Sequence, residues 1–288
     1  AAGDTYTFAP GHSTPRRSRA RAALRVIAAG PLVGVLEARW SAIGADIRLR
    51  VSLAAGERFV RCVVDCNNHA TNRRLRVRMP TGIRAETALA GAHFGGQARA
   101  VNRDGDCPSE APVRTAPAHR YVAASTGRRG LALLAPGFFE YEWTGTDLLM
   151  TLLRSVGDLS RGDLAERPGH AGWVTPTPGA QCLGHDRIEL ALAPIGSSEC
   201  ADDVLTGLWE EAMLPLRGVW LRDAVGLTPH APSIELSGPG LVLSAVKPAE
   251  DGDGTVLRCY NARDEDVAGT WSIAPAPTRP QASDKMVR

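Results

Sequence analysis

Directional hydrogen-bonding side chains crowd one short segment of the sequence. The stretch "LLRSVGDLSRGDLAERPGHAG", residues 152–172, opens as an apolar strand and continues as a glycine-punctuated loop that carries Arg154, Asp158, Arg161, Asp163, Arg167 and His170. Arginine presents a rigid fork of donors, whereas aspartate offers only acceptors. Each hydroxyl of a sugar both donates and accepts, so this mixture suits a neutral polyol. Ordinary structural hydrogen bonding in a loop uses the same residue types, and the composition leaves both interpretations open.

No motif in the rest of the chain indicates a catalytic or metal-binding residue. Its seven histidines show no H-x-x-x-H or other metal-ligand spacing, and it contains no G-x-S-x-G elbow. The stretch "AEDGDGT" at 249–255 is followed by Ala262 where an EF-hand loop needs its last carboxylate, so we expect a turn between two strands there. We therefore predict no catalytic residue, no metal ligand and no cofactor in this chain.

The charge and hydropathy of the chain limit the classes of partner that it is expected to bind. With 33 basic and 31 acidic residues the net charge is +2, which gives no field that would attract nucleic acid or an anionic membrane. No apolar run approaches the ~18 residues needed to span a bilayer. We therefore expect a soluble, cytoplasmic protein with no nucleic-acid partner and no membrane partner.

Six cysteines are scattered along the chain without C-x-x-C spacing. Cys62 and Cys66 in "RCVVDC" fall on one face of an expected strand. Buried free thiols are the favoured interpretation, and a disulfide between some pair of cysteines is the alternative.

Short apolar segments separated by turn residues predict an all-β, antiparallel sandwich. Alternation is clear in "DIRLRVSL", where Ile47, Leu49 and Val51 share one face. One helix is expected within 200–213 as a short connector, which Pro215 ends. The expected strands cover residues 31–40, 45–53, 58–66, 74–79, 120–124, 130–135, 138–143, 147–154 and 187–193.

These elements divide the chain into three parts. We expect a large β domain over residues 1–212 and a small C-terminal β-sandwich unit over residues 213–273. Residues 274–288 are rich in proline, alanine and serine, which predicts a disordered tail.

Six collinear blocks of the sequence resemble a known family, the bacterial glycoside hydrolase family 38 α-mannosidases, over the C-terminal half of its members. Because the blocks follow one another in the family's order, the match is specific. The resemblance implies a supersandwich of the galactose mutarotase-like kind for the large domain. The blocks are "GDTYTFAP" at 3–10, "RRLRVRMPTGI" at 73–83, "PAHRYVAASTGRRGLALLAPGFFEYEW" at 117–143, "LLMTLLRSVGDLSRGDLAERPGHAG" at 148–172, "TPGAQCLGHD" at 177–186 and "LVLSAVKPAEDGDGTVLRCYN" at 241–261.

The resemblance also implies a function that this chain carries only in part. Members of the family hold an aspartate nucleophile and most of a zinc site in an N-terminal catalytic domain, and a helical bundle with a His-His-Asp motif adds a zinc ligand. No H-H-D occurs in these 288 residues. The chain is therefore expected to be the C-terminal β half of a zinc-dependent retaining α-mannosidase, with the zinc in a catalytic domain that is absent from this chain.

The partners that follow from the resemblance are a mannose-containing glycan or mannoside and the N-terminal catalytic domain. Without that domain, an uncovered interface could also pair copies of the chain into a homo-oligomer.

The resemblance carries substrate-binding roles to particular residues. Tyr6 in "GDTY" matches a family tyrosine that contributes to the sugar-binding cleft, and Arg161 fits a family arginine in the loop after a strand. Arg154 is expected to support Arg161, with Asp4 and His170 as further substrate-binding residues close by. We therefore expect Tyr6 and Arg161 at one rim of the sandwich, close enough to approach one hexose together.

Two alternatives from other functional classes stay open. A non-catalytic carbohydrate-binding or structural β module would need no catalytic domain. Sugar epimerisation would need a histidine and a carboxylate that face one sugar, for which His119, His170 and Glu189 are available, although a fold alone does not confer a function.

The pure 288-residue chain should not hydrolyse an aryl α-mannoside, with or without added zinc, because no nucleophile and no zinc-ligand set can be assigned in it. Release of the aryl group, followed by its absorbance, checks this expectation. Metal-dependent turnover by the pure chain would contradict it.

Overall fold

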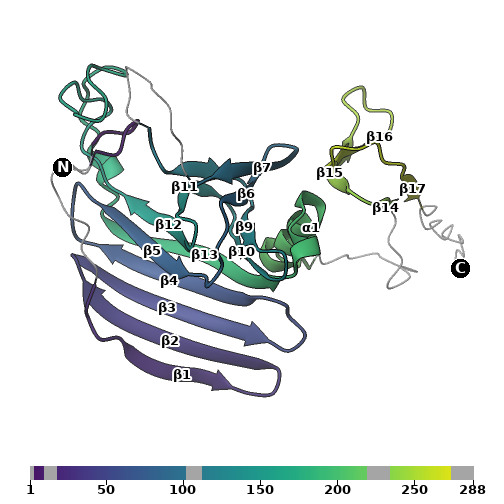
Figure 1. Ribbon diagram of the computed structural model, residues 1–288, viewed down its shortest axis with the longest axis horizontal. Coiled ribbons are helices and arrows are strands. Elements are labelled where there is room, and N and C mark those ends of the chain that lie inside the picture. The colour runs from purple at the N-terminus through teal and green to yellow at the C-terminus, as the bar shows by residue number, and fades with distance from the viewer. Residues whose placement is uncertain (1–2, 10–17, 102–111, 219–233, 274–288) are drawn as a thin grey trace, which may run out of the picture. The chain divides into compact units, whose positions relative to one another are not determined.

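The computed structural model describes residues 3–9, 18–101, 112–218 and 234–273 of the chain (Figure 1). Contacts between Cα atoms separate two compact units, Ala1–Met213 and Leu214–Arg288. The expected tail at 274–288 lies outside the described residues.

The larger sheet of the first unit has nine strands, and its hydrogen-bonded neighbours run antiparallel (Figure 1). Most neighbours in this sheet are also neighbours in sequence, so hairpins build much of it. In spatial order the strands are β1 (Ala23–Ala29), β2 (Val33–Ala42), β3 (Ala45–Ala54), β4 (Val60–Asn68), β13 (Gly184–Ile195), β10 (Gly130–Leu134), β9 (Tyr121–Ser125), β6 (Thr87–Ala92) and β7 (Gly95–Ala100).

A four-stranded antiparallel sheet packs on one face of the larger sheet and completes the sandwich. Val122 and Leu133 of the larger sheet meet Tyr141 and Met150 of the smaller one in the buried core. The predicted all-β, antiparallel sandwich is therefore confirmed. The four strands, in spatial order, are β5 (Arg74–Pro80), β12 (Asp147–Arg154), β11 (Phe138–Trp143) and β8 (Ala116–Ala118).

Alternation of apolar and polar residues explains which face of each strand in the larger sheet is buried. In β3 the side chain of Ile47 is buried in the core, while Arg48 and Arg50 point to the opposite face. There Arg48 pairs with Asp65 and Arg50 pairs with Glu37, each at 2.9 Å. The polar face of these strands is thus tied together by cross-strand ion pairs.

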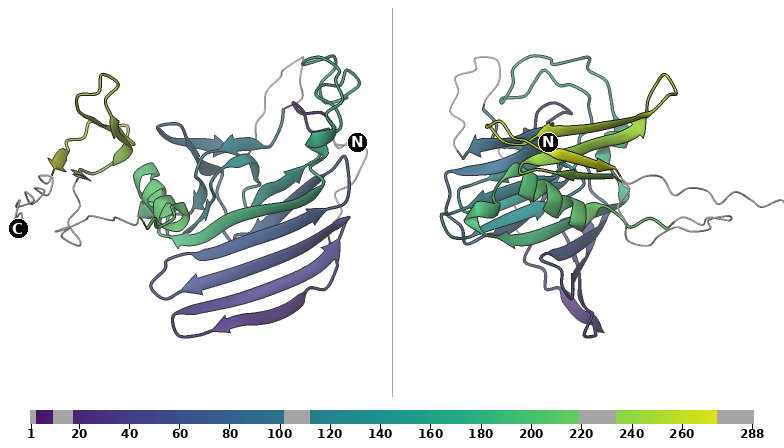
Figure 2. Two further views of the ribbon diagram at one scale, coloured as in Figure 1. Left: turned by 180° about the vertical axis from the view of Figure 1, so that it is seen from behind. Right: turned by 90° about the vertical axis from the view of Figure 1, so that its right-hand side faces the viewer.

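One helix, α1 (Asp202–Met213), packs on the outer face of the larger sheet (Figure 2). Leu205 and Leu208 of the helix contact a cluster that includes Tyr121 and Leu134 of the sheet. The Tyr121 hydroxyl donates to the Asp202 carboxylate at the first turn of the helix. The helix lies where the sequence predicts it, but it is part of the core rather than only a connector. Two short 3-10 helices are also present, η1 (Pro178–Gln181) and η2 (Ser197–Glu199).

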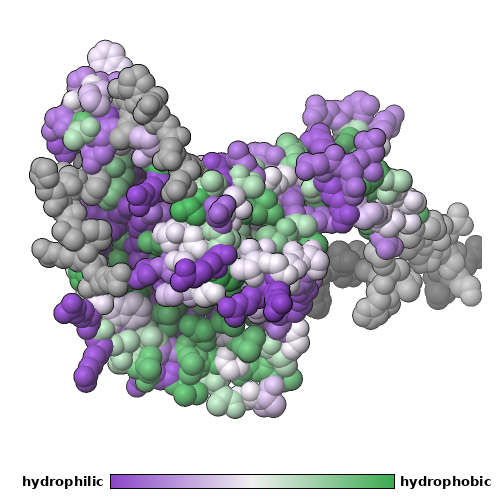
Figure 3. Space-filling view, in the orientation of Figure 1, coloured by the Kyte–Doolittle hydropathy of each residue, from purple (hydrophilic) through white to green (hydrophobic). Residues whose placement is uncertain are grey.

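The larger sheet extends beyond the smaller one along β1 and β2. Leu24, Val26 and Leu36 are 77%, 66% and 56% exposed on these strands. Figure 3 shows the resulting apolar surface as green atoms over the lower strands of the view. An apolar sheet face of this kind is typical of a surface that another layer covers.

The second unit contains two small antiparallel sheets. β14 (Ile234–Ser237) pairs with β17 (Thr270–Ile273), and β15 (Leu241–Pro248) pairs with β16 (Thr255–Asn261). Residues 249–254 connect β15 to β16, so the turn predicted between two strands is confirmed.

The nine strands expected in the first unit are all present: β11 and β12 have the predicted ends, and the other seven have shifted ends. Four other strands of this unit, β1, β6, β7 and β8, were not predicted. Their sequences "ALRVIAA", "TALAGA", "GGQARA" and "APA" are rich in alanine and glycine, which have low β propensity. Pairing with neighbouring strands overrides that propensity.

Two findings concern only the described residues. None of their helices is long and apolar enough to cross a bilayer. Their five cysteines are free, as the favoured interpretation has it, but only Cys62 and Cys66 are buried; Cys200 and Cys259 are half-buried and Cys182 is exposed. Cys107 lies outside the described residues.

We propose that the two units are separate domains, with the boundary near residue 212 that the sequence predicts. Limited trypsin digestion of the native chain should then cut first after the exposed Arg217, which follows α1, and leave the sandwich intact. Mass spectrometry of the fragments checks this. A first cut inside the sandwich strands would contradict the proposed boundary.

Candidate functional site

A buried carboxylate joins the N-terminal segment to a distant loop. Asp4 is 0% exposed, and its Oδ1 accepts the backbone N–H groups of Tyr6 at 3.0 Å and Thr7 at 2.8 Å. Its Oδ2 accepts the backbone N–H of Arg161 at 2.7 Å and a guanidinium N–H of Arg167. We call this cluster of five residues the Asp4 junction. It fixes the place of Tyr6 relative to Arg161, although 155 positions separate them in the chain (161 − 6).

The backbone before and after Asp4 is held as firmly as its side chain. Gly3 has φ +84°, and a Cβ there would lie 2.0 Å from the carbonyl oxygen of Thr7, so only glycine fits. The hydroxyl of Thr5 donates to the carbonyl oxygen of Leu159 at 2.6 Å. Arg154, the last residue of β12, donates to the carbonyl oxygens of Asp4 at 2.6 Å and Thr5 at 3.2 Å.

The loop that receives this segment, residues 156–177, is tied to itself by backbone bonds. Leu159 N–H donates to Thr175 O at 2.8 Å, and Asp158 forms an isolated β-bridge with Pro176. The buried hydroxyl of Ser160 accepts the N–H groups of Ala171 at 3.0 Å and Gly172 at 3.2 Å. Figure 2 shows this loop, in teal, next to the purple N-terminal segment in both views. The loop therefore has a defined shape despite its lack of regular structure.

Arg161 carries its guanidinium outward from the Asp4 junction. Its Nε and Nη2 donate to the two carboxylate oxygens of Asp163 at 2.9 and 2.6 Å, a bidentate pair. The hydrogen bond from Arg161 lowers the pKa of the Asp163 carboxyl, so the pair is ionised at neutral pH. Two of the five N–H groups are used, and three have no partner among the described residues.

Tyr6 shares the Asp4 carboxylate with Arg161 through its backbone N–H, and its side chain extends into solvent. The side chain is 54% exposed, and a Cβ on Gly172 would come within 3.0 Å of the hydroxyl oxygen. On the other side, the guanidinium of the buried Arg167 lies 5.9 Å from the centre of the ring. The phenol is thus held from two sides, and its hydroxyl has no hydrogen-bond partner among the described residues.

A hollow of about 610 Å³ opens at Arg161, and Tyr6 is not among the residues that line it. His170 forms part of its wall and packs closely on Gly162, where an added Cβ would lie 2.5 Å from the imidazole Cε1. We call it the loop pocket. It is lined by Asp158, Arg161, Gly162, Asp163, His170 and Val174.

The charge of Asp4 depends on its donors. Burial would raise the pKa of this carboxyl, but the N–H groups of Thr7, Arg161 and Tyr6 and the charge of Arg167 outweigh burial, so the pKa lies below the ordinary 3.8. A depressed carboxylate pKa adds stability above the ordinary value, and the stability is lost as the pH falls through the depressed value. We therefore expect the junction to hold at every pH above about 4.

The predicted site residues fall into two groups. Tyr6, Arg161 and His170 expose polar atoms at one rim of the sandwich, whereas Asp4 and Arg154 lie behind them as supports. Whether any of them binds a sugar stays a prediction.

Sequence reasoning missed the roles of Asp163 and Arg167. Asp163 follows Arg161 by two residues, a short spacing at which a bidentate pair is available in a loop. Arg167 offers no such signal, because its partner Asp4 is distant in the chain.

The residues considered for epimerisation have different neighbours. His119 stacks on His93 with ring centres 5.4 Å apart, and Glu189 pairs with Arg187 at 2.9 Å on β13. Only His170 lines the loop pocket. Among the described residues no three His, Cys, Asp or Glu side chains gather as they would for a metal ion.

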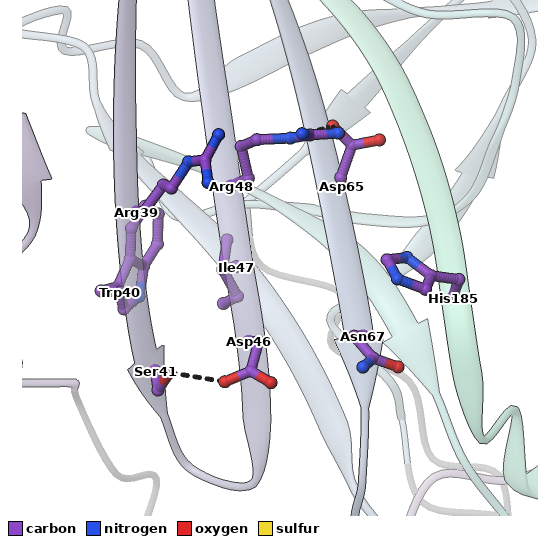
Figure 4. A pocket seen from close by; sticks show the side chains of 9 residues that line it. All are labelled: Arg39, Trp40, Ser41, Asp46, Ile47, Arg48, Asp65, Asn67 and His185. Carbon is purple, nitrogen blue, oxygen red and sulfur yellow. Dashed lines mark hydrogen bonds and ion pairs between the residues drawn. The ribbon is translucent and has the colours of Figure 1, made fainter. Parts of the chain in front are cut away.

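A second hollow, of about 520 Å³, lies on the polar face of β2, β3, β4 and β13 (Figure 4). Its charged groups already have partners: Asp46 accepts from Ser41 and His69, and Arg48 pairs with Asp65. We call it the sheet pocket, and it resembles the ion-paired solvent face of a sheet more than a ligand site.

Comparison with known proteins places these features in one family. Residues 1–158 match the family model "Glycosyl hydrolases family 38 C-terminal domain", and residues 240–285 match "Glycosyl hydrolases family 38 C-terminal beta sandwich domain". A curated protein of Halalkalibacterium halodurans, named "Putative mannosylglycerate hydrolase", is 29% identical over 226 residues. The matched part is 76% of this chain and 23% of that protein, so the chain spans less than a quarter of this relative.

Two crystal structures from Enterococcus faecalis share the fold. One is the structure of a protein in glycosyl hydrolase family 38, with a TM-score of 0.75. The matched region covers 96% of this chain and 35% of that protein's chain. The other is the structure of an alpha-mannosidase from strain V583, with a TM-score of 0.77. The matched region covers 94% of this chain and 33% of the alpha-mannosidase chain. Each is 18% identical to this chain.

Replacement of Asp4 by alanine should release the 156–177 loop, because Arg167 would keep a buried charge without its partner. Breaking a buried pair costs about 3 to 5 kcal/mol, so hydrogen exchange of the Arg161, Ala171 and Gly172 amides should accelerate by at least about a hundredfold. An Asp163→Ala variant is the matched control, because its exposed ion pair contributes about 1 kcal/mol or less. Equal exchange in the two variants would show that the Asp4 junction does not hold the loop.

Proposed function

This chain belongs to glycosyl hydrolase family 38, as its C-terminal region, and we propose that it is the β half of a zinc-dependent, retaining α-mannosidase. In this proposal the catalytic domain lies outside these 288 residues, and the chain lends substrate-binding side chains to the cleft. The observation that carries the proposal is the Asp4 junction, in which one buried carboxylate binds the backbone N–H groups of both Tyr6 and Arg161 and so holds these two residues at the same rim.

The groups at this rim suit the hydroxyls of a hexose. Arg161 would donate its three remaining N–H groups, and the hydroxyl of Tyr6 would donate or accept. Asp158 and Asp163 offer carboxylate oxygens in the same loop pocket. A sugar hydroxyl needs both kinds of partner, so this mixture supports a polyol more than an apolar ligand.

The charge of the loop pocket favours a neutral sugar over an anion. Arg161 is already paired with Asp163, and Asp158 adds a further negative charge. In the proposal the pocket therefore holds the mannose part of the substrate. An acidic aglycone, such as the glycerate in the name of the Halalkalibacterium halodurans relative, would bind to groups outside the pocket.

The bond-breaking groups of the proposed enzyme belong to the other half of the cleft. A retaining glycosidase uses one carboxylate as nucleophile and a second carboxyl group as acid and then base, about 5 to 5.5 Å apart. The described residues of this chain offer no metal-ligand cluster, so they do not fit a zinc site, and the proposal assigns zinc to the catalytic domain. The chain's own part is to bind and orient the sugar.

Replacement of Arg161 by alanine should weaken the binding of methyl α-mannoside to the chain by about 1.5 to 3 kcal/mol, the usual contribution of hydrogen bonds to a charged group. Titrations followed by nuclear magnetic resonance check this. Arg187→Ala is the matched control, since Arg187 also pairs with a carboxylate two residues later but lies on the face of β13. Equal losses in both variants, or no binding by the wild-type chain, would contradict the proposed role.

A further inference from the structure

One large aromatic side chain near the proposed site is almost fully exposed. Trp173 is 86% exposed, more than any other aromatic side chain among the described residues. Removal of a large aromatic side chain from water is favourable because apolar surface is buried. An indole exposed to solvent can therefore still gain stabilisation by packing against an apolar surface.

The backbone on both sides of Trp173 is fixed. Gly172 N–H donates to the buried Ser160 hydroxyl at 3.2 Å, and Thr175 O accepts the N–H of Leu159 at 2.8 Å. The exposed indole thus projects from an anchored turn rather than from a loose chain. Little further ordering of the backbone would be needed when a ligand binds to it.

The neighbours of Trp173 belong to the proposed sugar site on both sides. Gly172 is the residue against which the hydroxyl end of Tyr6 lies. Val174 lines the loop pocket together with Arg161 and His170. The exposed indole therefore lies, along the chain, between a residue that adjoins Tyr6 and a residue of the loop-pocket wall.

The polar groups already described can bind the hydroxyls of a sugar, but they offer no partner for the apolar face of its ring. A pyranose ring has hydroxyls at its edge and an apolar face of C–H groups, and ligand pockets combine aromatic surfaces with a few polar groups. The indole of tryptophan offers a broad apolar face for such a ring.

We propose that Trp173 is the stacking platform of a second sugar-binding subsite, for the ring that adjoins the mannose held by Tyr6 and Arg161. This inference rests on the proposed function. It gives the chain a preference for a mannose-containing disaccharide over a simple mannoside, because the second ring would lie on the indole.

The test compares two ligands on the full 288-residue chain, methyl α-mannoside and an α-linked mannobiose. We expect the wild-type chain to bind the disaccharide at least fivefold more tightly, and Trp173→Ala to remove that preference while leaving the affinity for methyl α-mannoside unchanged. Trp173→Phe should keep part of the preference. Phe94→Ala, which removes an exposed aromatic side chain at the β6–β7 turn, is the matched control and should change neither affinity.

The possible outcomes separate this inference from the proposed function. If Trp173→Ala binds both ligands as the wild type does, the second subsite is wrong and the mannoside site stands. If the wild-type chain binds neither ligand, the proposed function is wrong and the subsite fails with it. Unchanged binding of methyl α-mannoside by Trp173→Ala shows that this variant is folded.

Discussion

The buried carboxylate of Asp4 is the constraint on which the rest of the candidate site depends. A carboxylate with no exposed surface is stable only when hydrogen bonds and a counter-charge replace its water, and here four N–H groups do so. Those donors come from the N-terminal segment and from the 156–177 loop, which are far apart in the sequence. Satisfying one charge therefore also sets the distance between Tyr6 and Arg161, which no local propensity would fix.

The sandwich makes this arrangement possible because it supplies a rigid edge. β12 is buried on the inner side of the smaller sheet and ends at Arg154, whose guanidinium holds the carbonyl groups of the N-terminal segment. The 156–177 loop then starts from a fixed point and is anchored again through Ser160 and Thr175. Sites built on rigid elements keep their groups in place with little ordering cost on binding, which is what a substrate-orienting surface requires.

The sequence predicts regular structure better than it predicts the supports of the site. Alternation in β3 and the long apolar run of β12 identify these strands because burial on one or both faces dictates their residue types. The alanine- and glycine-rich β6 and β7 carry no such signal, because they form strands only through pairing. Within the site, the types of Tyr6 and Arg161 point to hydrogen bonding, and the substrate-binding role that we propose for them comes from the family resemblance.

The partner of Arg167, by contrast, could not be read from the chain. An aspartate in an N-terminal "GDTY" and an arginine 163 positions later form a buried pair only after the whole sandwich has closed. The same reason hides the close packing of Gly162 on His170, which depends on the path of the loop rather than on spacing. Long-range polar contacts thus account for most of what the sequence left open.

In our proposal the Asp4 junction presents Tyr6 and Arg161 to a single sugar. Intermolecular nuclear Overhauser effects from carbon-13-labelled methyl α-mannoside to the full chain test it most directly. Contacts from one mannose ring to both the Tyr6 ring protons and the Arg161 side-chain protons, lost in Asp4→Ala, are the predicted result. Contacts to residues of the sheet pocket such as Asn67 and His185, with none to Tyr6 or Arg161, would contradict the account.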